Sequence, residues 1–110
     1  MLFCIMANYT PESVNALMEH TESRLPAVRN LVEAAGGKVV SMYSTAAEGP
    51  GVMVIIDVPD PNVAPAISGV AVASGAVKDV KFFRLISQDE VVAIRKKATE
   101  IRKAYKPPSK

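Results

Sequence analysis

The chain contains few side chains that are typical of catalysis, and His20 is its only histidine. It stands in the polar segment 20–24, directly after Glu19. Imidazole groups titrate near neutral pH and can transfer protons there. The same composition is also typical of an exposed loop without a chemical role. His20 is therefore a candidate acid or base, with a surface loop as the alternative.

Arg84 is a second candidate, because it interrupts the apolar segment 78–86. A charge that is buried needs a partner or a ligand. If Arg84 points into a cavity between sheet and helices, it would hold a carboxylate or an enolate through charge-assisted hydrogen bonds. Asp57, which interrupts the apolar segment 51–58, is a candidate partner. The alternative is a strand-end arginine that packs its stem and reaches water.

Three residues with hydroxyl groups, Tyr9, Ser41 and Tyr43, follow or interrupt other apolar segments. Methionine side chains near them would line a cavity with a flexible apolar surface. Methionines at such positions are also common core filling. The candidate catalytic residues are His20, Tyr9 and Arg84, and the candidate substrate-binding residues are Ser41, Tyr43, Met42 and Asp57.

Metal and cofactor chemistry has no support in the sequence. The single cysteine, Cys4, excludes an internal disulfide and provides no metal-ligand spacing. Metal ligands normally come in convergent sets, which one histidine and scattered carboxylates do not form. The glycines at 36–37 and 49–51 lack the spacing of a phosphate-binding loop and are interpreted as turns. We expect neither a metal nor a cofactor.

The elements that must position these residues can be predicted from their periodicity and their capping residues. Thr10 and Pro11 begin a helix that Pro26 prevents from continuing, so a break is expected across residues 20–24. Ser87 and Glu90 form a capping box before the longest helix. The predicted strands are 2–7, 38–44, 51–58 and 78–86, and the predicted helices are 10–19, 25–36, 62–75 with Asn62 as N-cap, and 88–105.

This order of elements predicts a ferredoxin-like α+β fold, a four-stranded antiparallel sheet with its main helices on one face. The strands are apolar on both faces, as in Leu2–Cys4–Met6 against Phe3–Ile5. Strands of this kind have both faces covered. A second copy of the chain is the economical cover, so we expect a homodimer. The alternative is that the last helix folds back over its own sheet.

Charge is distributed unevenly along the chain. Residues 1–87 carry 6 basic and 8 acidic side chains, whereas residues 88–110 carry 7 basic and 3 acidic ones. We therefore divide the chain into a body, 1–87, and a basic C-terminal helix and tail, 88–110. The helix lacks interleaved aromatic residues, which argues against nucleic acid as a partner. The first apolar run is too short for a signal peptide or a membrane span, and a cytoplasmic protein is expected.

Several motifs resemble the GYD-domain family. They are Tyr9-Thr10-Pro11-Glu12, residues 24–29 (RLPAVR), residues 34–38 (AAGGK), Val58-Pro59-Asp60 and residues 73–77 (ASGAV). The resemblance covers roughly residues 1–90 and implies a dimeric α/β-barrel of ferredoxin-like protomers. The Gly-Tyr-Asp triplet itself is not retained, since the chain has Gly49-Pro50-Gly51 at that place. Any role of that tyrosine and aspartate cannot be transferred.

Two functions remain open. In the first, a dimeric barrel binds or transforms a small organic metabolite without a permanent cofactor; a transformation would be proton transfer or oxygenation, with Arg84 orienting an anion. In the second, a non-catalytic assembly docks partners through the C-terminal helix, whose Val91, Ile94, Ala98 and Ile101 recur at three- and four-residue steps.

Overall fold

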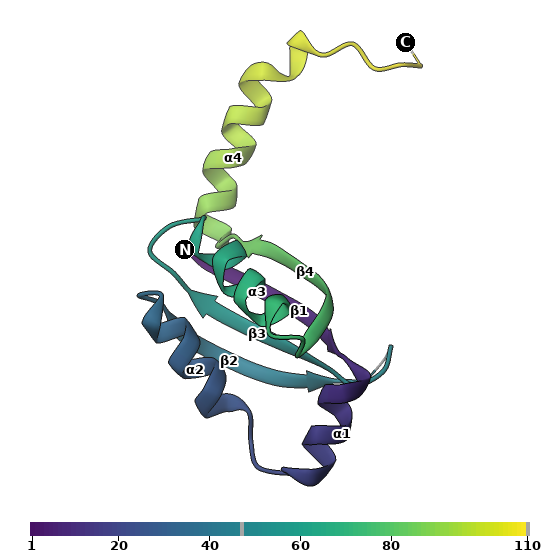
Figure 1. The fold of residues 1–110 in the computed structure, drawn as a ribbon. Helices are drawn as coiled ribbons and strands as arrows, with labels where there is room; N and C mark the ends of the chain where they lie inside the picture. Colours follow the sequence, from purple (N-terminus) through teal and green to yellow (C-terminus); the bar gives the residue numbers. More distant parts are fainter. Residues whose placement is uncertain (47, 110) are drawn as a thin grey trace.

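The computed structural model describes residues 1–46 and 48–109 as one antiparallel sheet with helices on one face (Figure 1). The chain runs β1 (Leu2–Tyr9), α1 (Pro11–Glu19), α2 (Leu25–Ala34), β2 (Lys38–Thr45), β3 (Gly51–Asp57), α3 (Val63–Ala73), β4 (Val77–Leu85), α4 (Gln88–Ile101) and the 3-10 turn η1 (Arg102–Ala104).

The sheet has four strands in the order β2-β3-β1-β4, and every neighbouring pair is antiparallel. β1 therefore lies between β3 and β4, as a ferredoxin-like order requires. The predicted α+β class is confirmed. Both edge strands carry an irregularity in register, between Val39 and Ser41 on β2 and opposite Met6 and Asn8 on β4.

Local signals account for most of the helix ends. Thr10 caps α1 by accepting a hydrogen bond from the backbone N–H of Ser13, and α1 ends at Glu19, as expected from the proline at position 26. Gly36 follows α2 at φ +83°, a conformation that glycine adopts without strain. Asn62 is an exception, because it precedes α3 in a helical conformation and its side chain makes no capping hydrogen bond.

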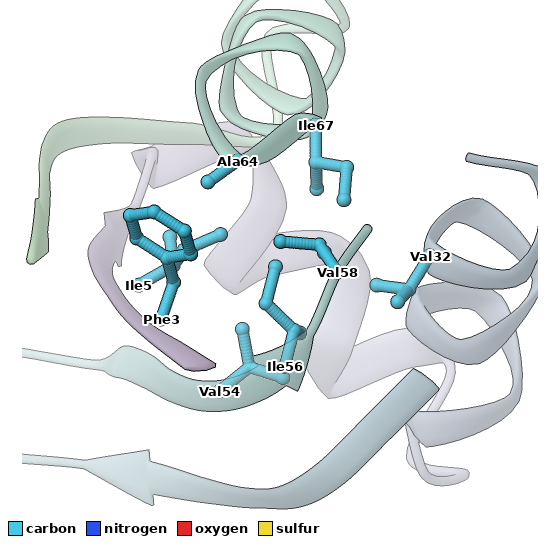
Figure 2. Packing of buried hydrophobic residues seen from close by; sticks show 8 residues of the cluster. All are labelled: Phe3, Ile5, Val32, Val54, Ile56, Val58, Ala64 and Ile67. Carbon is cyan, nitrogen blue, oxygen red and sulfur yellow. The ribbon is translucent and has the colours of Figure 1, made fainter. Parts of the chain in front are cut away.

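The hydrophobic core lies between the helix-bearing face of the sheet and the two helices α2 and α3. β1 contributes Phe3 and Ile5, whose register partners Ile56 and Val54 on β3 point to the same face. Figure 2 shows these side chains converging with residues of α2, α3 and the segment after β3. The remaining buried members of the core are Val32, Val58, Ala64 and Ile67.

The other face of the sheet carries no helix in Figure 1. Met53 and Ile55 on β3 point to this face, as do their register partners Met6 and Cys4 on β1. Phe83, opposite Cys4 on β4, is 46% exposed. Leu2, Tyr43 and Leu85 extend the same apolar surface to its edges. We call this surface the open face.

α4 does not cover the open face. It projects away from the body of the molecule (Figure 1), and none of its residues is buried. The alternative that the last helix folds back over its own sheet is therefore wrong for this structure. Across residues 1–46 and 48–109, no helix has the combined length and apolar character needed to cross a membrane.

Candidate functional site

Two hollows meet at the end of β1, on the helix-bearing side of the sheet. The first, the polar cavity, has a volume of about 370 Å³ and lies between α1, the segment 20–24 and the residue before β4. The second, the apolar groove, has a volume of about 200 Å³ and lies between α2 and α3 over the sheet. Tyr9, Arg24 and Ala76 line both. The two hollows together have the size of a small-molecule site.

The backbone holds Tyr9 firmly at this junction. Its N–H donates to the carbonyl of Pro50 at 3.0 Å, and this bond extends the pairing of the two strands by one residue before the start of β3. The neighbouring Thr10 donates its N–H to the carbonyl of Ala76 and its hydroxyl to the carbonyl of Gly75, the latter at 2.8 Å. These bonds connect the end of β1 to the turn before β4. The backbone of Tyr9 is thus fixed between the start of β3 and the start of β4.

Arg24 reaches the junction from the other side. The helix break across residues 20–24 carries the chain from α1 back to the sheet, and Ser23 stabilises the turn by accepting a hydrogen bond from the N–H of Leu25 at 3.1 Å. Arg24 then stands immediately before α2. It lines both hollows, whereas Arg29, about one turn further along α2, lines neither. Arg24 is therefore the cation of this site.

The pKa of the Tyr9 phenol reflects these surroundings. Burial raises this pKa above its ordinary value of 10.0, and the positive charge of Arg24 opposes part of the rise. The phenol is therefore protonated at neutral pH and can donate a hydrogen bond to an acceptor beside Arg24.

His20 belongs to the polar cavity together with Ser13, Glu22 and Ser23. Its backbone N–H closes α1 by donating to the carbonyl of Ala16, while its side chain is exposed. Two of the candidate catalytic residues, Tyr9 and His20, thus line one cavity. The structure brings them together through the folding of α1 onto the end of β1.

The apolar groove is built from the side chains that α2, α3 and the sheet leave incompletely packed. Its walls include Val28 and Leu31 of α2 and Val70 and Ala71 of α3. Its floor is Ile5, Ala7 and Val54 of the sheet. The Ser68 hydroxyl, which also lines the groove, is turned toward the carbonyl of Ala64 at 3.1 Å. Apart from the Tyr9 and Arg24 end, the groove favours an apolar ligand surface.

Arg84 lies elsewhere. It is on the same face of the sheet, but its register partner is Phe3, six residues from Tyr9 along β1. At about 3.3 Å per residue this is roughly 20 Å from the Tyr9 end. Its guanidinium pairs with Glu90 at 2.7 Å in an exposed ion pair. The structure therefore matches the alternative of a strand-end arginine, and Arg84 lines neither hollow.

The candidate substrate-binding residues are divided between the two faces. Met42 is opposite Val54 and packs against the core, and with Tyr43 it lines a further hollow beside His20. Ser41 and Asp57 point to the open face, because their β3 and β1 register partners are Ile55 and Leu2. The Asp57 carboxylate lies 3.0 Å from the amino group of Met1. It does not pair with Arg84, because β1 separates the two strands.

Cys4 is buried, and this burial raises the pKa of its thiol. A raised pKa leaves the thiol protonated and poorly reactive. Among residues 1–46 and 48–109, no group of three or more histidine, cysteine, aspartate and glutamate side chains lies close enough to hold a metal ion.

Sequence reasoning missed Arg24 and the groove behind it. The only signal was position: an arginine two residues before Pro26, in the predicted break, must stand close to the start of the second helix. This position does not indicate which residue lies beside Arg24 in the folded chain. The partner, Tyr9, lies fifteen residues earlier and becomes a neighbour only when α2 packs on the sheet.

Comparison with known proteins agrees with this architecture. The GYD domain model matches residues 3–94. No curated protein matches the sequence. A 5-chloro-2-hydroxyhydroquinone dehydrochlorinase from Burkholderia phenoliruptrix, solved with 2,5-dihydroxybenzoquinone, is 15% identical over 81% of this chain and 97% of that chain, with a TM-score of 0.56. Ribosomal protein S6 from Thermotoga maritima is 14% identical over 92% of this chain and 96% of that chain, with a TM-score of 0.51.

Proposed function

We propose that this chain, which belongs to the GYD-domain family, binds a small organic molecule with an acidic group. The proposal rests on the geometry at the Tyr9 end of β1, where the two hollows meet. The ligand's apolar part occupies the apolar groove between α2 and α3. Its acidic group lies at Arg24 and Tyr9. The observation that carries the proposal is that one arginine and one phenol line both the polar cavity and the apolar groove.

The chemistry of the ligand follows from the lining. The groove presents valine, leucine, isoleucine and alanine side chains, which gain free energy by covering an apolar or aromatic body. A guanidinium binds a carboxylate or an enolate through charge-assisted hydrogen bonds. A protonated phenol donates one further hydrogen bond to the same anion. An amphipathic acid satisfies all three.

Proton transfer is the reaction that these residues support best. His20 lines the polar cavity and supplies an imidazole, while the Tyr9 phenol holds its proton at neutral pH. Arg24 would stabilise the negative charge that develops when a carbonyl compound becomes an enolate. The dehydrochlorinase with a similar fold acts on an aromatic compound, and an aromatic acid is the ligand that we propose first for this groove.

A matched pair of probes tests the binding. Benzoate and its neutral amide, benzamide, have nearly the same shape, and only benzoate carries a charge. We expect isothermal titration or NMR shifts at groove residues to detect benzoate and to detect benzamide at least tenfold more weakly. The substitution Arg24→Met should weaken benzoate binding by about 10- to 100-fold. This range corresponds to the loss of a hydrogen bond to a charged group, which contributes about 1.5–3 kcal/mol.

The control variant is Arg29→Met, which removes an equal charge from α2, about one turn from Arg24 and outside both hollows. It should bind benzoate like the unmodified protein. Equal losses in the two variants would mean that net charge, and not the Arg24 site, attracts the anion. Equal affinities for benzoate and benzamide would also contradict the proposal.

We also propose that two copies pair through their open faces to form the barrel. Met53, Ile55 and Phe83 provide the apolar centre of each face, and nothing in the described part of the chain covers them. If each copy buries about 600 Å² of apolar surface, the gain is about 15 kcal/mol per copy before association costs. That is enough to form a stable pair.

Light scattering tests this pairing. Met53→Glu places a charge at the centre of the open face and should halve the mass in solution, because an unpaired charge cannot be buried in the interface. Met53→Leu keeps the face apolar and should leave the mass unchanged. If the unmodified protein has the mass of one chain at micromolar concentrations, the proposed pairing is wrong.

A further inference from the structure

The second unpartnered surface of the molecule is the apolar side of α4. Val91, Ile94, Ala98 and Ile101 follow one another at three- and four-residue steps and so form one stripe. Ile94 is 48% exposed and Ile101 is 56% exposed. After its first turn, where Glu90 pairs with Arg84, no strand or other helix of the described residues packs along α4. The stripe therefore lacks a cover within its own chain.

A second α4 is a poor cover for this stripe. Arg95 and Arg102 flank it on one side and Lys97 on the other. Two such helices packed stripe to stripe would bring these like charges together at the flanks, where charge selects the partner. Only about two heptads are available, too few for a stable coiled coil. The stripe requires a partner that is apolar and acidic at the same time.

α1 combines those two properties. No lysine or arginine occurs from residue 10 to residue 23, while Glu12 and Glu19 are exposed on the same side of α1, about two turns apart. Met18, beside Glu19, is 72% exposed, and α1 has no buried residue. The apolar and acidic side of α1 thus complements the apolar and basic side of α4.

The topology makes this contact intermolecular. β1 leads into α1 and β4 leads into α4, and β1 and β4 are antiparallel neighbours. The two helices therefore leave the sheet at opposite ends, as Figure 1 shows. α4 cannot reach α1 of its own chain, but two copies placed side by side and antiparallel bring each α4 to the α1 of the other. A two-fold arrangement forms the contact twice.

We propose that α4 of one copy packs antiparallel on α1 of a second copy, with Met18 between Ile94 and Ile101, Glu19 facing Arg95 and Glu12 facing Arg102. α4 then serves as an arm that joins two copies. Because α1 forms a wall of the polar cavity, the arm also holds that wall in place. The contact does not depend on ligand binding or on pairing through the open face.

Disulfide crosslinking between two differently tagged copies tests the contact. One copy carries Met18→Cys and the other Ile101→Cys; the unmodified chain, whose Cys4 is buried, gives the background. Under mild oxidation we expect disulfide-linked heterodimers several-fold more abundant than with Ala34→Cys on the exposed surface of α2 in place of Met18→Cys. Equal yields from Met18→Cys and Ala34→Cys would overturn the proposal.

Charge exchange tests the orientation of the pair. Adding Glu19→Lys to the Met18→Cys copy should reduce the heterodimer several-fold, and adding Arg95→Glu to the Ile101→Cys copy should restore it. High salt should weaken the unexchanged pair, since the charges are exposed. All four substitutions are at exposed positions, and circular dichroism verifies that the copies are folded. If Glu19→Lys leaves the heterodimer yield unchanged, or if Arg95→Glu does not restore a reduced yield, α4 contacts another surface and the inference is wrong.

Discussion

Ile55 and Ile56 are neighbours on β3 that point to opposite faces of the sheet, and truncating each to alanine provides a direct test of what covers each face. Ile56 is fully buried in the core beneath α2 and α3. Ile55 is half-buried on the open face, where Cys4 is its register partner. The two substitutions remove the same atoms from the same strand, so they differ only in their surroundings.

The magnitude for Ile56→Ala follows from its burial. Three buried carbons at about 0.8 kcal/mol each account for about 2.4 kcal/mol of lost transfer free energy. The cavity left among Val32, Val58 and Ile67 adds to this, because a packed core relaxes only in part. We expect a loss of about 3–4 kcal/mol in the free energy of unfolding.

The magnitude for Ile55→Ala depends on the second copy. In an isolated chain its partly buried side chain contributes about 1.5–2 kcal/mol. If the open faces pair, the same side chain is buried and its loss approaches the value for Ile56→Ala. Pairing also makes unfolding depend on concentration: a hundredfold dilution should cost the pair about 2.7 kcal/mol.

Urea unfolding followed by circular dichroism, at two protein concentrations a hundredfold apart, measures all these quantities. Ile56→Ala should be costly at both concentrations. A loss below 1 kcal/mol for Ile56→Ala would refute the assignment of the core. A cost of about 1.5–2 kcal/mol for Ile55→Ala, with midpoints that do not move on dilution, would refute pairing through the open face.

Three further predictions rest on single contacts. Burial raises the pKa of Tyr9 above 10.0 in the folded chain, so the neutral phenol contributes stability that is complete below pH 10 and lost as pH rises through the folded pKa. Tyr9→Phe should remove this loss of stability, and absorbance titration should detect one phenol ionisation fewer. Gly51→Ala should destabilise the protein by about 1–3 kcal/mol in thermal unfolding, because a Cβ would lie 2.6 Å from the Ala7 carbonyl oxygen. Gly69→Ala on α3, where nothing lies within 4 Å of the added Cβ, should stabilise the protein by about 0.5–1 kcal/mol. Ser87→Ala removes the hydroxyl that caps α4 and should reduce helical dichroism, at a cost of about 1 kcal/mol confined to that helix; an equal loss of global stability would contradict the description of α4 as a separate arm.

Much of the fold could be predicted because its signals are local. The Ser87 and Glu90 capping box, the Thr10 cap with Pro11, and Gly36 after α2 each act within a few residues, and all three are present. The apolar pattern of β1 and β3 also predicted a sheet with two apolar faces. Asn62 shows the limit, since a residue type that often caps a helix makes no such bond here.

The site could be predicted only in part. The chemistry of their side chains indicates Tyr9 and His20 as candidates, and the structure places both beside one cavity. The interruption of an apolar strand indicates Arg84 as a candidate, yet Arg84 lies at the other end of the sheet and pairs with Glu90. The period of two along a strand indicates the face of a residue, but it does not indicate which end of the face holds a cavity.

The sequence by itself determined the class of the fold, the ends of most helices, and the presence of more apolar strand surface than one layer of helices can cover. These properties depend on residue type and short spacing. Only the tertiary structure decided that Arg24 joins Tyr9, that Ser41 and Asp57 face away from them, and that α1 and α4 leave the sheet at opposite ends. The reason is that such neighbours are set by strand order and helix packing, which bring together residues that no local interaction connects.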